Sequence, residues 1–186
     1  GFTGVTCTNG SGSARSGQFA SFTDEEMQAV RKKEQNTAAV IGEYAAMIQL
    51  DFPSAVIKDP TNASLEADLV KVLKASRPEI VYTHNPADKH DTHIAVFHAT
   101  LRALRSLPKE QRPTQVIGCE VWRGLDWMLD SDKVAMNVSG NEALAEKLNG
   151  VFASQIAGGK RYDLATIGRR LANATFFESH GVDQTN

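Results

Sequence analysis

The stretch "EIVYTHNPADKHDTHIAV", residues 79–96, contains the change from strand to helix that decides the fold. Its first five residues, 79–83, are mostly β-branched or aromatic and follow Pro78, which predicts a strand. Beyond the polar middle, apolar residues recur at spacings of three and four and predict an amphipathic helix over residues 91–106. These residues are Ile94, Phe97, Leu101 and Leu104. A strand, a polar loop and a helix in this order form one βα unit.

The same alternation continues on both sides of this unit. Further strands are predicted at about residues 2–8, 46–50, 115–121 and 134–138, and further helices at about 24–43, 64–76, 141–157 and 162–178. Strands that alternate with helices indicate an α/β fold, with a mostly parallel sheet covered by helices on both faces. The chain of 186 residues has no internal repeat and no long linker, so we expect a single domain over residues 1–186.

Charge and composition argue against several classes of partner. The chain has 20 Lys and Arg against 22 Asp and Glu, with both signs interspersed, so no basic surface favours nucleic acid. No run approaches the roughly 20 apolar residues that span a bilayer. Cys7 and Cys119 are isolated and form no CxxC pair, which is typical of free thiols in a cytoplasmic protein. The expected partner is therefore a small molecule.

The polar middle of the opening stretch is the candidate site. Residues 83–93 hold three of the five histidines and two aspartates. Ligands in open α/β sheets bind at the carboxyl ends of the strands, where this loop is expected. His90 and His93 are three apart on one helical face, so we expect both imidazoles to point over the sheet and away from water. A neutral imidazole suits zinc.

The HxxH pair is an incomplete metal site by itself, because a catalytic zinc takes three protein ligands and a water. The alternative interpretation is that Asp88 or Asp91 caps the helix while His90 is solvated. His84 could support the site from behind or hydrogen-bond to backbone. His98 falls among apolar neighbours, which indicates a packed or partly exposed histidine.

Together with "VTCTNGSGS" at 5–13 and "AVRKKEQNTAAVIG" at 29–42, the opening stretch resembles the LmbE-like or PIG-L family of zinc-dependent N-deacetylases. The resemblance implies a single LmbE-like domain with a Rossmann-like sheet. It also implies hydrolysis of N-acetyl groups on an amino sugar or related glycoconjugate, with zinc or another divalent metal as cofactor. The sequence does not decide whether the protein forms a homo-oligomer.

The family motif also implies roles for individual residues. His93 matches the metal ligand, and His90 matches the group that protonates the leaving amine or stabilises the oxyanion. The family often has an orienting aspartate directly before the metal histidine, where this chain has Thr92; Asp91 stands one place earlier, and Asp88 is the alternative. Arg31, with Glu34, matches a helix segment near the substrate pocket in relatives, and the alternative is a solvated helix face.

The resemblance implies a second metal motif, a strand ending in HPDD or AHPDDE, upstream of residues 5–13, and the sequence does not contain it. We therefore expect the sequence to be a truncated portion that lacks an N-terminal βα unit and is inactive alone. The alternative function is a non-catalytic sugar- or nucleotide-binding module, in which the loop at 10–17 cradles an anion with backbone N–H groups and Arg15. Trp122 and Trp127 could stack on a sugar, pack in the core or form an oligomer contact, and His180 has no assigned role.

Overall fold

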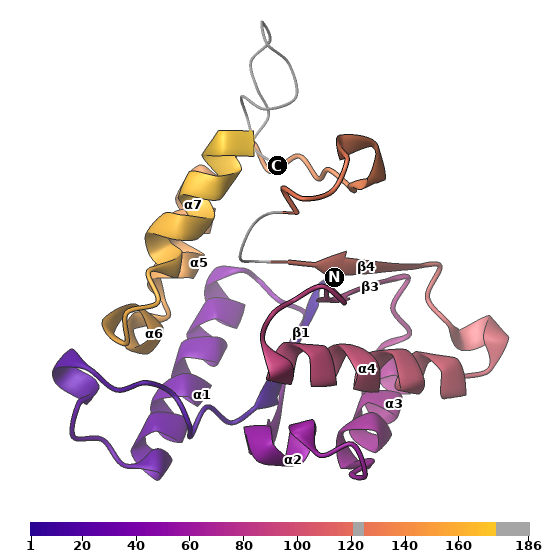
Figure 1. Ribbon diagram of the computed structural model, residues 1–186, viewed down its shortest axis with the longest axis horizontal. Helices are drawn as coiled ribbons and strands as arrows, with labels where there is room; N and C mark the ends of the chain where they lie inside the picture. Colours follow the sequence, from indigo (N-terminus) through magenta and orange to yellow (C-terminus); the bar gives the residue numbers. More distant parts are fainter. Residues whose placement is uncertain (121–124, 174–186) are drawn as a thin grey trace, which may run out of the picture. The chain divides into compact units, whose positions relative to one another are not determined.

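The computed structural model describes residues 1–120 and 125–173 (Figure 1). The chain divides into two compact units. The first contains residues 1–2, 11–47 and the described residues from 125 onward, and the second contains residues 3–10 and 48–120. The single domain expected over residues 1–186 stays a prediction.

The strands form two short parallel sheets. The first pairs β1 (Thr3–Thr8) with β2 (Ala46–Phe52), and the Asn9 N–H donates to the Phe52 carbonyl oxygen at 3.0 Å, which joins the carboxyl ends of both strands. The second pairs β3 (Ile80–His84) with β4 (Gln115–Cys119) in parallel register, with Ile80 opposite Gln115 and His84 opposite Cys119. The predicted α/β class with parallel strands is confirmed.

The second unit packs its helices around α4. The helical segments are α2 (Ser54–Lys58), α3 (Ser64–Ser76), α4 (Asp91–Ser106) and the 3-10 turn η2 (Lys109–Gln111). Helix α4 contacts β3, α2 and α3, as Figure 1 shows. The buried core consists of Cys7, Ile57, Leu65, Leu69, Leu73, Ala99, Ala103, Leu104 and Leu107. Each fully buried leucine contributes roughly 1.5–3 kcal/mol, so this core holds the start of α4 beside the end of β3.

The first unit is helical. It contains η1 (Gly17–Phe19), α1 (Asp24–Ile41), η3 (Asp130–Asp132), α5 (Glu142–Gly150), α6 (Ala153–Ala157) and α7 (Tyr162–Asn173). The predicted capping box starts α1, because Thr23 Oγ1 accepts from the Glu26 N–H at 3.2 Å and Glu26 Oε2 accepts from the Thr23 N–H at 2.8 Å. Helix α1 contacts α5 and α6, and α7 contacts the same two helices.

Two predicted elements of the first unit are wrong. The strand predicted at 134–138 is irregular backbone, and Val134 and Met136 are 63% and 40% exposed, because no neighbouring strand pairs with this segment. The helix predicted at 141–157 divides into α5 and α6. The Ser154 N–H donates to Glu34 Oε1 at 2.7 Å, whereas a continuous helix would direct it to the Gly150 carbonyl.

The other boundaries differ slightly from the predictions. The strand predicted at 115–121 ends at Cys119 within the described residues. The helix predicted at 162–178 is described only to Asn173, and the rest of that prediction lies outside the described residues. The short helix α2 and the three 3-10 turns were not predicted, because segments of three to five residues show no readable periodicity.

Candidate functional site

The candidate site begins where β3 ends. His84 is the last residue of β3 and pairs with Cys119 of β4, and the next residue, Asn85, donates its N–H to the Cys119 carbonyl oxygen at 2.9 Å. The loop that follows therefore leaves the sheet at the carboxyl edge of its two strands. The loop ends at Asp91, the first residue of α4. This is the βα position predicted from the sequence.

Asn85 holds this loop in place, and the sequence interpretation assigned it no role. Asn85 is buried; its Oδ1 accepts from the Ala87 N–H at 2.9 Å and its carbonyl accepts from the Asp88 N–H at 3.0 Å. Beneath it, a Cβ added to Gly118 of β4 would lie 3.3 Å from Asn85 Cα. The available signal was the Asn-Pro pair at 85–86, which favours a turn.

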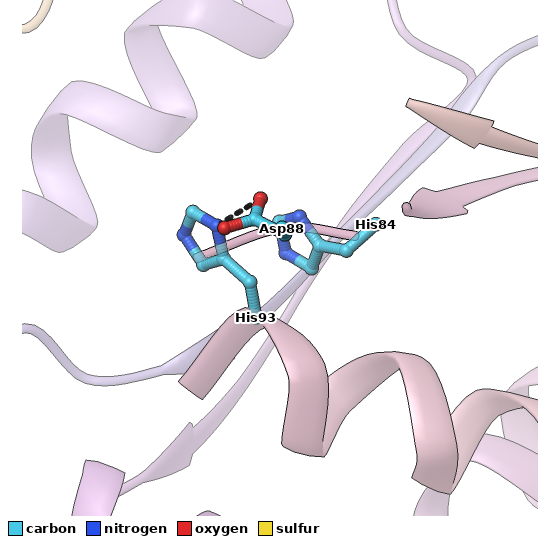
Figure 2. Close-up of side chains that lie close together, drawn as sticks. All are labelled: His84, Asp88 and His93. Carbon is cyan, nitrogen blue, oxygen red and sulfur yellow. Dashed lines mark hydrogen bonds and ion pairs between the residues drawn. The ribbon is translucent and has the colours of Figure 1, made fainter. Parts of the chain in front are cut away.

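Asp88 is the buried centre of the loop. Its side chain is 0% exposed, its Oδ1 accepts from the His90 N–H at 2.8 Å, and its Oδ2 lies 2.9 Å from His93 Nδ1 (Figure 2). An ionised carboxylate can only accept hydrogen bonds, so the His93 Nδ1 donates to it. One carboxylate thus fixes the backbone before α4 and the ring that rises from the first turn of α4.

His90 caps the start of α4. Its Nδ1 accepts from the Thr92 N–H at 3.3 Å, and the residue is exposed, whereas the His93 side chain is 25% exposed. The expectation that both imidazoles point away from water is therefore wrong for His90, because its ring is used as the helix cap. The sequence suggested Asp88 or Asp91 as the cap of this helix, but His90 is the residue that caps it. Asp91 is exposed in the first turn, where its charge favours the helix dipole.

The three histidine rings of the cluster stack on one another. The ring centroids of His84 and His93 lie 4.0 Å apart with planes at 3°, and those of His90 and His93 lie 4.6 Å apart with planes at 25°. The pKa of His84 is lowered to about 4, mainly by burial and also by the neighbouring His93 and His90, whereas Asp88 opposes this shift. His84 is therefore a neutral ring at neutral pH.

The donor set fits a divalent ion in its chemistry. His84, Asp88 and His93 each offer one ligand atom, and these atoms lie within 4.8 Å of one another. In a tetrahedral zinc site with bonds of about 2.0–2.1 Å, neighbouring ligand atoms lie roughly 3.3–3.4 Å apart, so this set is somewhat open.

The stacking of the rings limits which of these residues can share an ion. A metal bound to an imidazole nitrogen lies close to the plane of that ring, and two parallel stacked planes have no point in common. His84 and His93 therefore cannot bind one ion together unless a ring turns. The residues fit an ion held by His93, with Asp88 beside it as a ligand or as a support.

Arg31 and Glu34 lie in the first unit, on α1, and not on a solvated helix face. Glu34 is buried, and its carboxylate accepts from the N–H and the Oγ of Ser154, both at 2.7 Å. The Arg31 guanidinium donates to Ser154 Oγ at 3.3 Å and lies 3.9 Å from Glu34 Oε2. Burial lowers the pKa of Arg31, and the Glu34 carboxylate opposes this. A role for Arg31 in substrate binding stays a prediction.

The other candidate residues are Arg15, His98, Trp122, Trp127 and His180. Arg15, in the glycine-rich loop, donates to the Ser11 carbonyl oxygen at 3.0 Å and forms an ion pair with Asp24, so its charge is already paired. His98 is exposed. Trp127 is 53% exposed, which excludes it from the core. Trp122 and His180 lie outside the described residues.

The fold resembles solved structures of differing activities. N,N'-diacetylchitobiose deacetylase from Pyrococcus horikoshii aligns with a TM-score of 0.67 at 17% identity, over 98% of this chain and 69% of that chain. The conserved protein TT1542 from Thermus thermophilus aligns at 0.59 and 20% identity, over 84% and 70%. GalB, the 4-carboxy-2-hydroxymuconate hydratase from Pseudomonas putida, aligns at 0.66 and 13% identity, over 98% and 80%. At these identities the likeness shows the fold alone.

Three further findings concern curated proteins, the helices and a family model. No curated protein matches the sequence. Among the described residues, none of the helices has both the length and the apolar character needed to cross a bilayer. The family model for PIG-L, described as GlcNAc-PI de-N-acetylase, matches residues 2–104, which are more than half of the chain and include the whole histidine cluster. The chain therefore belongs to the PIG-L family.

Proposed function

We propose that the protein is a metal-dependent hydrolase that removes the N-acetyl group from an amino sugar or a related glycoconjugate. Membership of a family described as de-N-acetylases supports the reaction, and the chitobiose deacetylase of the same fold supports a sugar substrate. The observation that carries the proposal is the pairing of His93 with a fully buried Asp88 at the carboxyl end of β3. This arrangement supports an oriented imidazole at the edge of a sheet where ligands bind.

Zinc, or another divalent metal, is the proposed cofactor, and His93 would hold it. When bound, such an ion polarises the amide carbonyl and lowers the pKa of a water to about 7. The sequence motif and the imidazole and carboxylate donors support this choice. A catalytic zinc takes three protein ligands, so further ligands are required beyond His93.

His90 is the proposed proton donor to the departing amine. Its Nδ1 accepts a hydrogen bond from the Thr92 N–H, so the neutral ring carries its proton on Nε2. This Nε2–H can donate a hydrogen bond to the oxyanion at the edge of the sheet. To protonate the amine, the exposed ring must first take up a second proton from solvent on Nδ1, and the imidazolium then gives up its Nε2 proton. Asp91, directly after it in the first turn of α4, is the proposed orienting carboxylate. Its negative charge next to the ring would stabilise the imidazolium that forms before the proton is transferred.

Several parts of the proposal concern the surroundings of the reaction. Arg31 is the proposed substrate-binding residue, on the strength of the family resemblance. A small N-acetylated sugar is the proposed partner, rather than nucleic acid. A location in the cytoplasm and assembly into a homo-oligomer stay predictions.

The test is to replace His93. We expect His93→Ala to lose both bound zinc and hydrolysis of N,N'-diacetylchitobiose, measured by metal analysis and by acetate release. His98→Ala is the matched control, because this histidine is exposed on the same helix outside the cluster, and it should change neither quantity. Unchanged zinc content and turnover in His93→Ala would refute the assignment.

Two other functions are distinguishable outcomes of the same measurement. Tight sugar binding without metal and without acetate release would indicate a non-catalytic binding module. The likeness to the hydratase GalB shows that this fold also occurs with another reaction, so acetate release must be measured directly and cannot be inferred from binding.

A further inference from the structure

We infer that Asp88 is a positioning residue that holds His93 in the tautomer with its proton on Nδ1, so that Nε2 is the metal-binding atom, and that His84 supports this ring by stacking instead of binding the ion. The inference rests on the proposed function for its consequence, metal binding by His93. Its structural content is independent of that function, because it concerns which nitrogen of one histidine carries the proton.

The first step of the argument is the hydrogen-bond count at Asp88. Its two oxygens accept from two different donors, the backbone N–H of His90 at 2.8 Å and Nδ1 of His93 at 2.9 Å. The side chain is 0% exposed, so water does not compete for these oxygens. Hydrogen bonds to an ionised acceptor of this length are roughly twice as strong as neutral ones. A proton on Nδ1 of His93 is therefore strongly favoured, which leaves the lone pair of the neutral ring on Nε2.

The second step separates an orienting role from a ligand role for Asp88. Each oxygen of Asp88 already accepts one hydrogen bond, and a rotation of the carboxylate toward the ion would break one of them. A buried donor left without its acceptor costs roughly 1–3 kcal/mol. The orienting role keeps both hydrogen bonds while the metal binds. Carboxylate groups commonly accept from the second nitrogen of a metal-binding histidine and fix its orientation in this way.

The third step concerns His84. Its ring lies 4.0 Å from that of His93 with planes at 3°, so an ion in the plane of one ring lies out of the plane of the other. His84 is the last residue of β3, and the pairing of β3 with β4 fixes the backbone of His84. A flat, neutral ring held at this place restricts rotation of His93 about its side-chain bonds. Any flat ring of similar size would do the same.

The experiment reads the protonation of ring nitrogens by NMR in the metal-free full-length protein labelled with ¹⁵N-histidine. The pH is set to about 8.5, above the ordinary histidine pKa of roughly 6.5, so that neutral rings are observed. We expect His93 to show a protonated Nδ1 and a lone-pair Nε2. A protonated Nε2 in the unmodified protein would overturn the inference, whatever happens in the variants.

Asp88→Asn is the decisive variant, because an amide has the shape of the carboxylate but only one accepting oxygen. If that oxygen accepts from the His90 N–H, the amide nitrogen faces His93 and favours the opposite tautomer, with the proton on Nε2. We expect the ring signals of His93 to reverse and zinc affinity to fall about 10- to 100-fold. An unchanged tautomer in a folded Asp88→Asn protein would overturn the inference.

His84→Phe is the matched variant for the stacking role, because it keeps a flat ring and removes both nitrogens. We expect zinc binding and the His93 tautomer to remain unchanged, whereas His84→Ala should weaken zinc binding. If His84→Phe lost zinc as completely as His93→Ala, His84 would be a ligand and this part of the inference would be wrong. Absence of deacetylation with the expected tautomer refutes only the proposed function. The opposite tautomer in an active enzyme refutes only the inference.

Discussion

Replacing Glu34 by alanine should destabilise the first unit more than any exposed substitution on α1. The carboxylate is buried, accepts two hydrogen bonds of 2.7 Å from Ser154, and lies 3.9 Å from the Arg31 guanidinium. Its removal leaves a partly buried cation without its counter-charge and two donors without an acceptor. Breaking a buried pair from one side costs about 3–5 kcal/mol, and the lost hydrogen bonds are part of that figure rather than an addition to it.

The assay is urea unfolding followed by circular dichroism, because helices dominate the first unit. We expect a loss of about 3–5 kcal/mol in the free energy of unfolding, equivalent to a melting temperature lower by roughly 6–20 °C for a chain of this size. Lys33→Ala is the matched control, an exposed residue next to Glu34 on the same helix, with an expected change within about 0.5 kcal/mol. Glu34→Gln keeps one acceptor and should fall between the two.

A loss below about 1 kcal/mol in Glu34→Ala would refute this reasoning, since that is the range of an exposed ion pair. The same variants also bear on Arg31. If Arg31 acts mainly by fastening α1 to α6, Arg31→Lys should lower stability and leave the KM for an N-acetylated sugar unchanged. If it binds substrate, KM should rise at unchanged stability.

Three other changes have defined outcomes in the second unit. Leu104→Ala empties part of the buried core and should cost about 2–5 kcal/mol in urea unfolding. Gly118→Ala brings a Cβ to 3.3 Å from Asn85 Cα and should lower the free energy of unfolding by about 1–3 kcal/mol. An unchanged free energy of unfolding would show that the loop at Asn85 shifts at little cost. Burial raises the pKa of Cys7 from 9.0 to about 11, so the unfolded chain ionises first. Stability should be complete below pH 9 and fall by up to roughly 3 kcal/mol as pH rises through 11, a loss that Cys7→Ala should abolish.

The sequence predicted the second unit better than the first. The strand before the histidine cluster and the helix after it were predicted within one residue, because apolar spacing reports directly on which face of an element is buried. The same reasoning failed at residues 134–138, where the alternating apolar residues are exposed. A period-2 pattern predicts a strand only if a neighbouring strand is present to pair with it, and a local pattern carries no information about that neighbour.

At the site, the spacing of histidines in the sequence also predicted some features correctly and others wrongly. The interval of three between His90 and His93 correctly predicted two imidazoles at the start of a helix, and the rings lie 4.6 Å apart. The same spacing suggested that both rings lie on one buried face of the helix, which is wrong for His90. The residue before the first helical turn adopts extended backbone, so helical periodicity does not apply to it.

The position of Asp88 depends on a residue that lies 30 positions further along the chain. Asp88 is buried because its own N–H bonds to the Asn85 carbonyl oxygen, and Asn85 lies against Gly118 of β4. A Cβ at residue 118 would lie 3.3 Å from Asn85 Cα, so Asn85 would have to shift by a few tenths of an ångström. Asp88 and Asp91 were alternatives for orienting the acid, His90; the structure places the Asp88 carboxylate against the His93 ring and leaves Asp91 exposed. Spacing within residues 83–93 could not have revealed this placement, because the deciding contact lies outside that stretch.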